Sequence, residues 1–334
     1  MATRRHFLLA TSWAVWSACA PRARTAAPPG TPAPPGTPVP PGTPGLQNPP
    51  DGPGAQRTPD VPAAIERRVG GRLGVYALDT GSGRALSHRP DERFAMCSTF
   101  KWLLAAAVLA RVDDGRLSLD ERVSYGPEDL IEHAPVTGAH VGEGGLTIGA
   151  LTEAIVTVSD NTAANLLLEK TGGPAGLTQY ARSLGDPVTR LDRRELELNT
   201  NHPGDPRDTT SPRAMVRLMQ EVLVGDALSP ASRERLLGWL RAAETGKRRL
   251  RAGLPSDWTV GDKSGSGGRN AVNDVAIAVP PGRAPILIAA YMSGSTSTFE
   301  ALEAGHVEVG RWVAHGFQAS AASPSHRAHD GPAR

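Results

Sequence analysis

Alternating and helical patterns of apolar residues divide the chain beyond residue 60 into distinct elements. Residues 63–68 repeat apolar positions with a helical period and predict an amphipathic helix. Residues 72–79 and 84–88 predict two strands, and the turn residues 80–83 between them predict a hairpin. The folded part of the chain is therefore expected to begin with a helix and a pair of strands.

A long helical section follows, and strand patterns return only near the end. The clearest helices are predicted at residues 102–111, 146–156 and 162–170. Later strands are predicted at 258–263, 274–279 and 285–292, before a last helix at 298–316. Strands at both ends with helices between them predict an α/β (α+β) fold, in which one antiparallel sheet is built from both chain ends, is flanked by helices and carries an all-helical lobe. A cleft between lobe and sheet is the expected place for chemistry.

The first 59 residues differ in composition from everything that follows. Residues 1–20 place Arg4 and Arg5 before an apolar run, which is the layout of an export signal. The arginine pair favours a twin-arginine signal, with a general secretory signal as the alternative. Residues 21–59 form a Pro/Gly-rich linker that repeats Pro-Pro-Gly-Thr-Pro three times. We expect a single catalytic domain over residues 60–318 and a disordered tail at 319–334.

The end of the signal bears on how the protein is held outside the cell. Cys19 follows Ser17 and Ala18, a context that resembles a lipoprotein processing site. A lipid on Cys19 would anchor the protein to the outer face of the cell membrane, and the alternative is secretion without an anchor. In either case the sequence predicts an extracytoplasmic location.

Charge and cysteine content exclude several classes of function. The formal net charge is only +2 and the one basic cluster, residues 247–251, is short, so a nucleic-acid partner is not expected. The two cysteines, Cys19 and Cys97, are too few for a disulfide framework. No segment after the signal has the length and apolar character of a transmembrane helix.

The first candidate chemistry lies where a helical run begins, at Ser98-Thr99-Phe100-Lys101. A spacing of three places the Ser98 hydroxyl and the Lys101 ammonium on one helix face. The ammonium and the positive end of the helix would both favour a serine alkoxide. The plain alternative is a helix cap followed by a solvated lysine, and the pattern alone is too short to decide between them.

Two further motifs carry polar groups at suggestive places. Ser-Asp-Asn at residues 159–161 precedes a predicted helix and is explained equally well by capping. In a functional interpretation, Ser159 relays a proton to a leaving nitrogen and Asn161 holds a substrate carbonyl. The run Lys-Ser-Gly-Ser-Gly-Gly at 263–268 ends a strand pattern, and its glycines would let a ligand lie along the strand edge. A phosphate-binding loop is disfavoured because no helix follows the glycines.

Together the three motifs resemble the Ser-x-x-Lys, Ser-Asp-Asn and Lys-Thr/Ser-Gly set of class A serine β-lactamases and penicillin-binding proteins. The resemblance extends over roughly residues 60–316. It implies a β-lactamase/transpeptidase-like fold, a monomer, and a serine acyl-enzyme mechanism that needs no metal or cofactor. The implied reaction opens the lactam amide of penicillins and cephalosporins and so confers antibiotic resistance. Ser98, Lys101, Ser159 and Glu195 are the implied catalytic residues, and the choice between Lys101 and Glu195 as the acylation base stays open.

The charged segment at residues 193–208 has no helical or strand period and looks like the Ω loop of the class A family. This loop distinguishes a hydrolase from a penicillin-binding protein. By this resemblance Glu195 and Asn199 hold the water that attacks the acyl-enzyme. Arg193 is expected to pair with Asp208 across the neck of the loop. Leu196 stands where many family members have a proline after a cis peptide bond, and we expect the fold to tolerate this difference.

The resemblance also assigns the substrate-binding side of the site. The main-chain amides of Ser98 and Ser266 are implied to hold the oxyanion. The implied substrate-binding residues are His133, Asn161, Asn199, Lys263, Ser264, Gly265, Ser266 and Arg249. Arg249 matches the position from which some actinobacterial members supply a carboxylate-binding arginine, because Val272 occupies the best-known position. For Arg249 the alternative is a solvated basic cluster, and for His133 it is an exposed loop histidine.

Cys97 is predicted to be a buried small residue rather than a reactive thiol. Some carbapenem-hydrolysing members link the corresponding cysteine to a second one, but Gly267 and Gly268 offer no thiol here. Two rival functions remain at this stage. One is a penicillin-binding sensor that stays acylated, and the other is a peptidoglycan carboxypeptidase or a Ser-x-x-Lys esterase.

Overall fold

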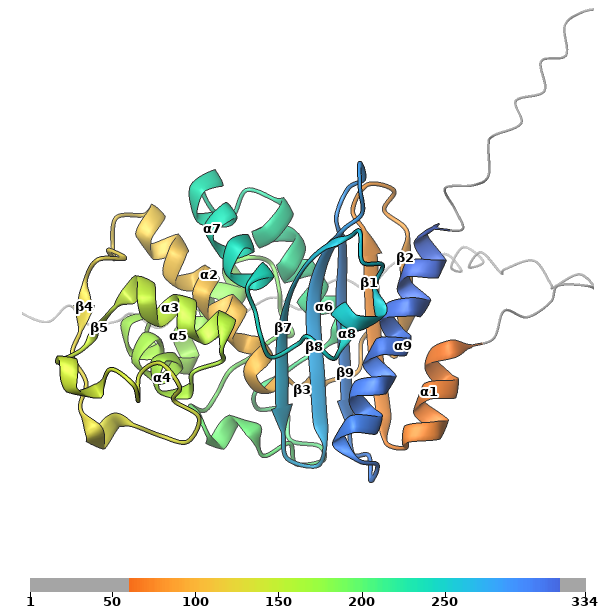
Figure 1. Ribbon diagram of the computed structural model, residues 1–334, viewed down its shortest axis with the longest axis horizontal. Coiled ribbons are helices and arrows are strands. Elements are labelled where there is room, and N and C mark those ends of the chain that lie inside the picture. The colour runs from red at the N-terminus through yellow and green to blue at the C-terminus, as the bar shows by residue number, and fades with distance from the viewer. Residues whose placement is uncertain (1–59, 319–334) are drawn as a thin grey trace, which may run out of the picture. The chain divides into compact units, whose positions relative to one another are not determined.

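The central sheet has five antiparallel strands in the spatial order β2-β1-β9-β8-β7 (Figure 1). The computed structural model describes residues 60–318, so the predicted export signal, linker and C-terminal tail lie outside the described residues. The strands are β1 Arg72–Asp79, β2 Ala85–His88, β7 Thr259–Gly267, β8 Ala271–Val279 and β9 Ile286–Ser293. Because β1 pairs with β9 along its whole length, early and late strands share one sheet, which confirms the predicted fold class.

Side chains on the two faces of the sheet belong to two separate hydrophobic cores. In β9, Ile288 belongs to the core under α1 (Val61–Val69) and α9 (Phe299–Gln318), whereas Leu287 and Tyr291 belong to the core shared with the lobe. This division follows the period of two with which side chains alternate along a strand. Because helices cover both faces (Figure 1), β8 and β9 are apolar almost throughout instead of alternating with polar residues.

The middle of the chain forms the all-helical lobe. Its central helix is α2, Phe100–Asp113, in which every residue from Phe100 to Leu109 is buried. A helix buried on all sides has no polar face, which explains why this stretch is apolar throughout apart from Lys101. Around α2 pack α3 Ile148–Thr157, α4 Asn161–Lys170, α5 Gly173–Ser183 and α7 Pro230–Arg241. A further helix, α6 Pro212–Met219, lies against β1 and β9 and joins the lobe to the sheet.

Short elements connect these larger ones. Two-residue strands form two small ladders, β3 Phe94–Ala95 with β6 Thr209–Thr210 and β4 Arg122–Val123 with β5 Leu146–Thr147. Single helical turns lie at Cys97–Thr99, Pro127–Asp129, Val141–Glu143 and Glu197–Asn199, with a π-helical turn at Gln220–Val224 and the short helix α8 at Leu250–Gly253. No helix within residues 60–318 is long and apolar enough to cross a membrane.

The structure corrects two predicted boundaries. The predicted strand ended at Lys263, but β7 continues through the glycine-rich run as far as Gly267, and Gly265 pairs with Asn273 of β8. Ladder hydrogen bonds use main-chain groups, so glycines can continue a strand that has no apolar pattern to reveal it. The predicted helix at residues 146–156 begins only at Ile148, because the Thr147 side chain accepts a hydrogen bond from Ala150 N and caps it.

Helices α8 and α9 cross at two glycines, and this crossing holds the segment that carries Arg249. A Cβ atom at Gly253 would overlap the main-chain oxygen of Val307, and one at Gly310 would lie 2.6 Å from the main-chain oxygen of Leu250. The backbones of the two helices can therefore approach this closely only because both positions lack a side chain.

Substitution of Gly253 by alanine should lower the free energy of unfolding by about 1–3 kcal/mol, because the added methyl group forces two helix backbones apart. Gly238→Ala in α7 is the matched control, since its added Cβ would meet no atom within 4 Å. The control should be neutral or stabilising by up to about 1 kcal/mol, since alanine favours a helix interior over glycine. Urea unfolding of both variants checks this, and equal effects would show that the crossing tolerates a side chain.

Candidate active site

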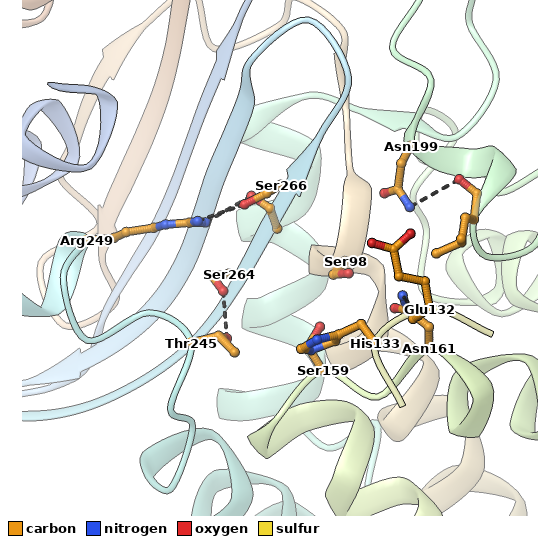
Figure 2. A pocket seen from close by; sticks show the side chains of 12 residues that line it. Ser98, Glu132, His133, Ser159, Asn161, Asn199, Thr245, Arg249, Ser264 and Ser266 are labelled. Atoms are coloured by element: carbon orange, nitrogen blue, oxygen red, sulfur yellow. Dashed lines mark hydrogen bonds between the residues drawn. The ribbon is translucent and has the colours of Figure 1, made fainter. Parts of the chain in front are cut away.

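A cavity of about 420 Å³ lies where β7 meets the helical lobe (Figure 2). It is lined by Ser98, Glu132, His133, Ser159, Asn161, Leu196, Asn199, Thr245, Arg249, Ser264, Gly265 and Ser266. Three other predicted residues, Lys101, Glu195 and Lys263, contact these lining residues and are 0%, 6% and 0% exposed. The structure thus brings all the candidate residues of the sequence to one place.

Ser98 lies on the single helical turn that leads into α2. Asn273 of β8 donates a hydrogen bond from Nδ2 to the main-chain oxygen of Ala95 (2.9 Å) and so ties the start of this turn to the sheet. A Cβ atom at Gly265 would lie 3.1 Å from the main-chain nitrogen of Ser98 and 2.8 Å from the main-chain oxygen of Met96. Glycine therefore allows β7 to pass close beside the serine.

The Glu195 carboxylate faces both Ser98 and Lys101. Ser98 Oγ donates to Glu195 Oε1 at 3.4 Å, and Lys101 Nζ lies 3.0 Å from the same oxygen. Ser98 and Lys101, which were predicted to lie close together, therefore both contact one carboxylate from a distant part of the sequence. The Coulomb attraction between two opposite charges is stronger here than at the surface because water screens it little.

The Ser-Asp-Asn segment surrounds the other side of Lys101. Lys101 Nζ donates to the main-chain oxygen of Ser159 (2.8 Å) and to Asn161 Oδ1 (2.5 Å). Asp160 is the cap of α4, accepting from Ala163 N at 2.8 Å, so the capping interpretation of this motif is correct for its middle residue. Ser159 has a φ of 64°, in the left-handed region that non-glycine residues seldom occupy, and its hydroxyl is thereby directed into the cleft.

Lys263 approaches Ser159 from the opposite side. Lys263 Nζ donates to Ser159 Oγ at 3.1 Å and to the main-chain oxygen of Ser264 at 2.9 Å. Burial, and then the positive charge of Lys101, lower the pKa of Lys263 to about 7. Burial also lowers the pKa of Lys101, partly offset by Glu195. Ser159 therefore has a lysine side chain on each side, and Lys263 can exchange a proton with it near neutral pH.

Two asparagines hold Glu195. Asn165 of α4 donates from Nδ2 to the main-chain oxygen of Glu195 (2.9 Å) and accepts from its main-chain nitrogen at Oδ1 (3.0 Å). Asn199 Nδ2 donates to Glu195 Oε2 at 2.6 Å. The peptide bond between Glu195 and Leu196 is cis, as the resemblance implied for this position. The carboxylate is fixed toward the cleft by bonds at both its backbone and its side chain.

The neck of the loop is closed by the predicted ion pair. Arg193 Nε lies 2.6 Å from Asp208 Oδ2, and Asp208 is fully buried. Asp208 Oδ1 also accepts from the main-chain nitrogens of Asp192 (2.7 Å) and Arg193 (2.9 Å). The two ends of the loop are therefore joined by charge-assisted hydrogen bonds, which are stronger than neutral ones.

Arg249 is a cleft residue and not part of a solvated cluster. It is only 3% exposed. Its Nη1 donates to the main-chain oxygens of Gly265 (2.9 Å) and Asn273 (2.7 Å), and its Nη2 donates to Ser266 Oγ (2.8 Å). Figure 2 shows the side chain extending toward Ser266. The guanidinium thus lies against β7 at the end of the cavity opposite the lobe.

His133 and Thr245 line the cavity with their side chains already engaged. His133 has a φ of 61° and its Nε2 lies 2.9 Å from the main-chain oxygen of Val158. Ser264 Oγ donates to Thr245 Oγ1 at 2.7 Å. The histidine is therefore part of the wall of the cleft, and the threonine orients a serine that was predicted to bind substrate.

The sequence pattern did not identify three residues that the structure places at the site. Asn165 lies one helical turn after Asn161, and this spacing of four was the signal that could have revealed it. Thr245 carries no such signal because its partner Ser264 comes from another part of the chain, and Glu132, although it precedes His133, belongs to none of the three motifs. Within residues 60–318, no group of three or more His, Cys, Asp and Glu side chains is placed to hold a metal ion.

Comparisons with known proteins agree with this geometry. A family model described as "Beta-lactamase enzyme family" matches residues 59–311. Beta-lactamase AST-1 of Nocardia asteroides is 50% identical over 238 residues, covering 71% of this chain and 76% of the relative. The carbapenem-hydrolyzing beta-lactamase KPC of Klebsiella oxytoca is 49% identical over 230 residues, covering 69% and 78%. A solved class A β-lactamase, the last common ancestor of Gram-negative bacteria, is 58% identical with a TM-score of 0.76, covering 77% of this chain and 97% of that one.

The chain belongs to the class A β-lactamases. It is a serine hydrolase of β-lactams, and the penicillin-binding and esterase alternatives are set aside.

In this β-lactamase, Cys97 is buried beside Ser98, and burial raises the pKa of its thiol to about 12. A Cβ atom at Gly267 would lie 2.6 Å from Cys97 Sγ. The cysteine is therefore the small buried residue that the sequence predicts, and β7 packs directly onto it.

The β-lactamase should become more stable with rising pH through Lys263. Its pKa of about 7 lies below that of an unfolded lysine, so between these values the unfolded chain binds more protons than the folded one. The free energy of unfolding therefore rises with pH in this window. Relative to Lys263→Met, which cannot titrate, the parent should gain roughly 1 kcal/mol per pH unit between about pH 7.5 and about pH 9.5. Urea unfolding of both proteins at matched ionic strength tests this, and a constant difference would contradict the buried neutral lysine.

Proposed function

We propose that this β-lactamase opens the lactam amide through an acyl-enzyme on Ser98 and that Glu195 activates the water that releases it. The observation that carries the proposal is the position of Glu195 Oε1, which lies 3.4 Å from Ser98 Oγ and 3.0 Å from Lys101 Nζ. A carboxylate beside the nucleophile can accept a proton from a water bound between them. Release of the acyl group needs such a base, whereas a sensor that stays acylated does not.

Acylation begins when Ser98 Oγ attacks the lactam carbonyl carbon and its proton passes to Glu195 or Lys101. Both acceptors contact one another, so the proton enters the same pair of groups in either case. The carbon–nitrogen bond of the lactam then breaks, and the nitrogen takes a proton from Ser159. Ser159 regains a proton from the lysines on its two sides, Lys263 at 3.1 Å and Lys101 at 3.4 Å. The main-chain amides of Ser98 and Ser266 hold the negative oxygen during the attack.

Deacylation reverses the roles of the same groups. Water loses a proton to Glu195 and forms a bond to the acyl carbon. The ester bond to Ser98 then breaks, and Ser98 Oγ takes the proton back from Glu195. Asn199, which donates to Glu195 at 2.6 Å, is the second group that holds this water. The product is the ring-opened acid of the penicillin or cephalosporin.

Substrate recognition is divided between the two walls of the cleft. We assign the substrate carboxylate to Lys263, Ser264 and Arg249 on the β7 side, where buried positive charge is available. On the lobe side Asn161 holds the side-chain carbonyl and His133 forms the wall. Gly265 lines the cavity on β7, the edge strand of the sheet, and we assign the substrate backbone to this edge. Penicillins and cephalosporins both carry the carboxylate and the amide side chain that this arrangement recognises.

Glu195→Ala should still be acylated but should release product at least about a thousandfold more slowly, because general-base catalysis is lost. Intact-protein mass spectrometry after mixing with benzylpenicillin should show the covalent adduct persisting. Glu197→Ala is the matched control, because Glu197 lies in the same loop but its side chain is exposed. This variant should hydrolyse benzylpenicillin at the parent rate. Hydrolysis by Glu195→Ala at the parent rate would remove Glu195 from the mechanism.

We propose that the enzyme acts as a monomer outside the cytoplasm and that Arg4 and Arg5 direct its export. The support for export is the sequence of residues 1–20, which lie outside the described structure, and the monomer is what the family resemblance implies.

Replacing Arg4 and Arg5 together by lysine should leave the enzyme in the cytoplasm, because the twin-arginine signal is read as a pair. Nitrocefin hydrolysis in intact cells should then fall relative to that in lysates. The matched control is the lysine substitution of Arg22 and Arg24, which follow the signal. Unchanged export of the first variant would favour a general secretory signal. In a separate measurement, the mass of the mature N-terminus would show whether Cys19 carries lipid.

A further inference from the structure

The first turn of α9 lies against Arg249 and has no part in the mechanism described above. The guanidinium carbon of Arg249 lies 5.4 Å from the centre of the Phe299 ring. Glu303 Oε1 lies 3.6 Å from Arg249 Nε. Phe299 and Glu303 are four residues apart on one helix, so they share a face. This face is brought to Arg249 by the glycine crossing of α8 and α9.

The hydrogen bonds of Arg249 are unevenly distributed. Its two terminal nitrogens donate to atoms of β7 and β8, whereas its buried Nε has no hydrogen-bond partner within residues 60–318. The 3.6 Å separation from Glu303 is too long for a hydrogen bond, and Glu303 Oε2 instead lies 2.9 Å from Arg248. Glu303 therefore attracts Arg249 without forming the bidentate ion pair that would neutralise the charge of the guanidinium.

An aromatic ring suits a cation that must stay available to a ligand. The face of a ring attracts a guanidinium through its quadrupole but carries no net charge, so it does not compete with an incoming carboxylate. Phe299 is 37% exposed, so more than a third of its surface is not packed against the protein. Its ring contacts Arg249, which lines the cavity.

We propose that Phe299 is a positioning residue that holds the Arg249 guanidinium against β7 and thereby sets the affinity of the enzyme for the carboxylate of its substrate. The proposal rests on the carboxylate-binding role of Arg249 given under the proposed function. Phe299 does not touch the reacting atoms, so its loss should weaken substrate binding without slowing the chemical steps.

Phe299→Ala should raise KM for benzylpenicillin about three- to tenfold and leave kcat within about twofold, because ground-state and transition-state binding are lost equally. Phe299→Leu keeps apolar bulk but lacks a ring face, and it should behave like the alanine variant. Phe299→Tyr restores the face and should return KM to near the parent value. Trp312→Ala removes another aromatic side chain of α9, one that packs on the core beneath that helix, and should leave KM unchanged.

Two further arms separate this proposal from the role of Arg249 itself. Toward a penicillin methyl ester, which lacks the charged carboxylate, Phe299→Ala and the parent should have the same KM. In an Arg249→Ala background the phenylalanine substitution should add nothing, because its target is gone. A raised KM in Arg249→Ala with an unchanged KM in Phe299→Ala would overturn the positioning role alone. Unchanged KM in both variants would overturn the role of Arg249 and the proposal with it, and recovery of KM by leucine would show that the ring acts only through its bulk.

Discussion

The buried ion pair between Lys101 and Glu195 is the interaction on which the rest of the site depends. Lys101 comes from α2 in the core of the lobe, and Glu195 comes from a loop almost a hundred positions later. Both side chains are removed from water, and the cost of this desolvation is recovered only when every remaining hydrogen-bonding position is satisfied. Asn161 and the main chain of Ser159 serve Lys101, whereas Asn199 and Ser98 serve Glu195. Ser98 is thus held by the same contacts that stabilise the charges.

The supporting contacts around this pair follow from its need for fixed geometry. The Asn165 side chain holds the backbone of Glu195, and the Arg193–Asp208 pair closes the loop at its neck. On the other wall, Arg249 lines the cavity, and buried Lys263 donates a hydrogen bond to Ser159. Burial raises the pKa of Asp262 and of Asp274, and the positive charges of Lys263 and Arg249 oppose that rise.

Much of the fold was predictable because burial imposes regular patterns. The first helix, β1, β9 and the last helix were each predicted close to their observed bounds, since each of them buries at least one face. The inner half of β7 was missed because glycine and serine residues pair through their backbones and carry no hydrophobic period. Thr245 and Asn165 were missed for a related reason, since each acts on a partner distant in sequence.

By itself the sequence determined the chemical groups of the enzyme: a serine with a lysine one turn later, a second serine before an asparagine, a lysine ahead of glycines and a glutamate in a charged loop. Each motif had a plain structural alternative, and Asp160 shows that such an alternative can hold together with the functional one. Only the tertiary structure decided that Glu195 lies opposite Ser98 and that Arg249 lies between β7 and α9 at the end of the cleft. Sequence patterns report on neighbours along a helix or strand, whereas these distances depend on how separate elements pack, and packing is set by all their buried faces at once.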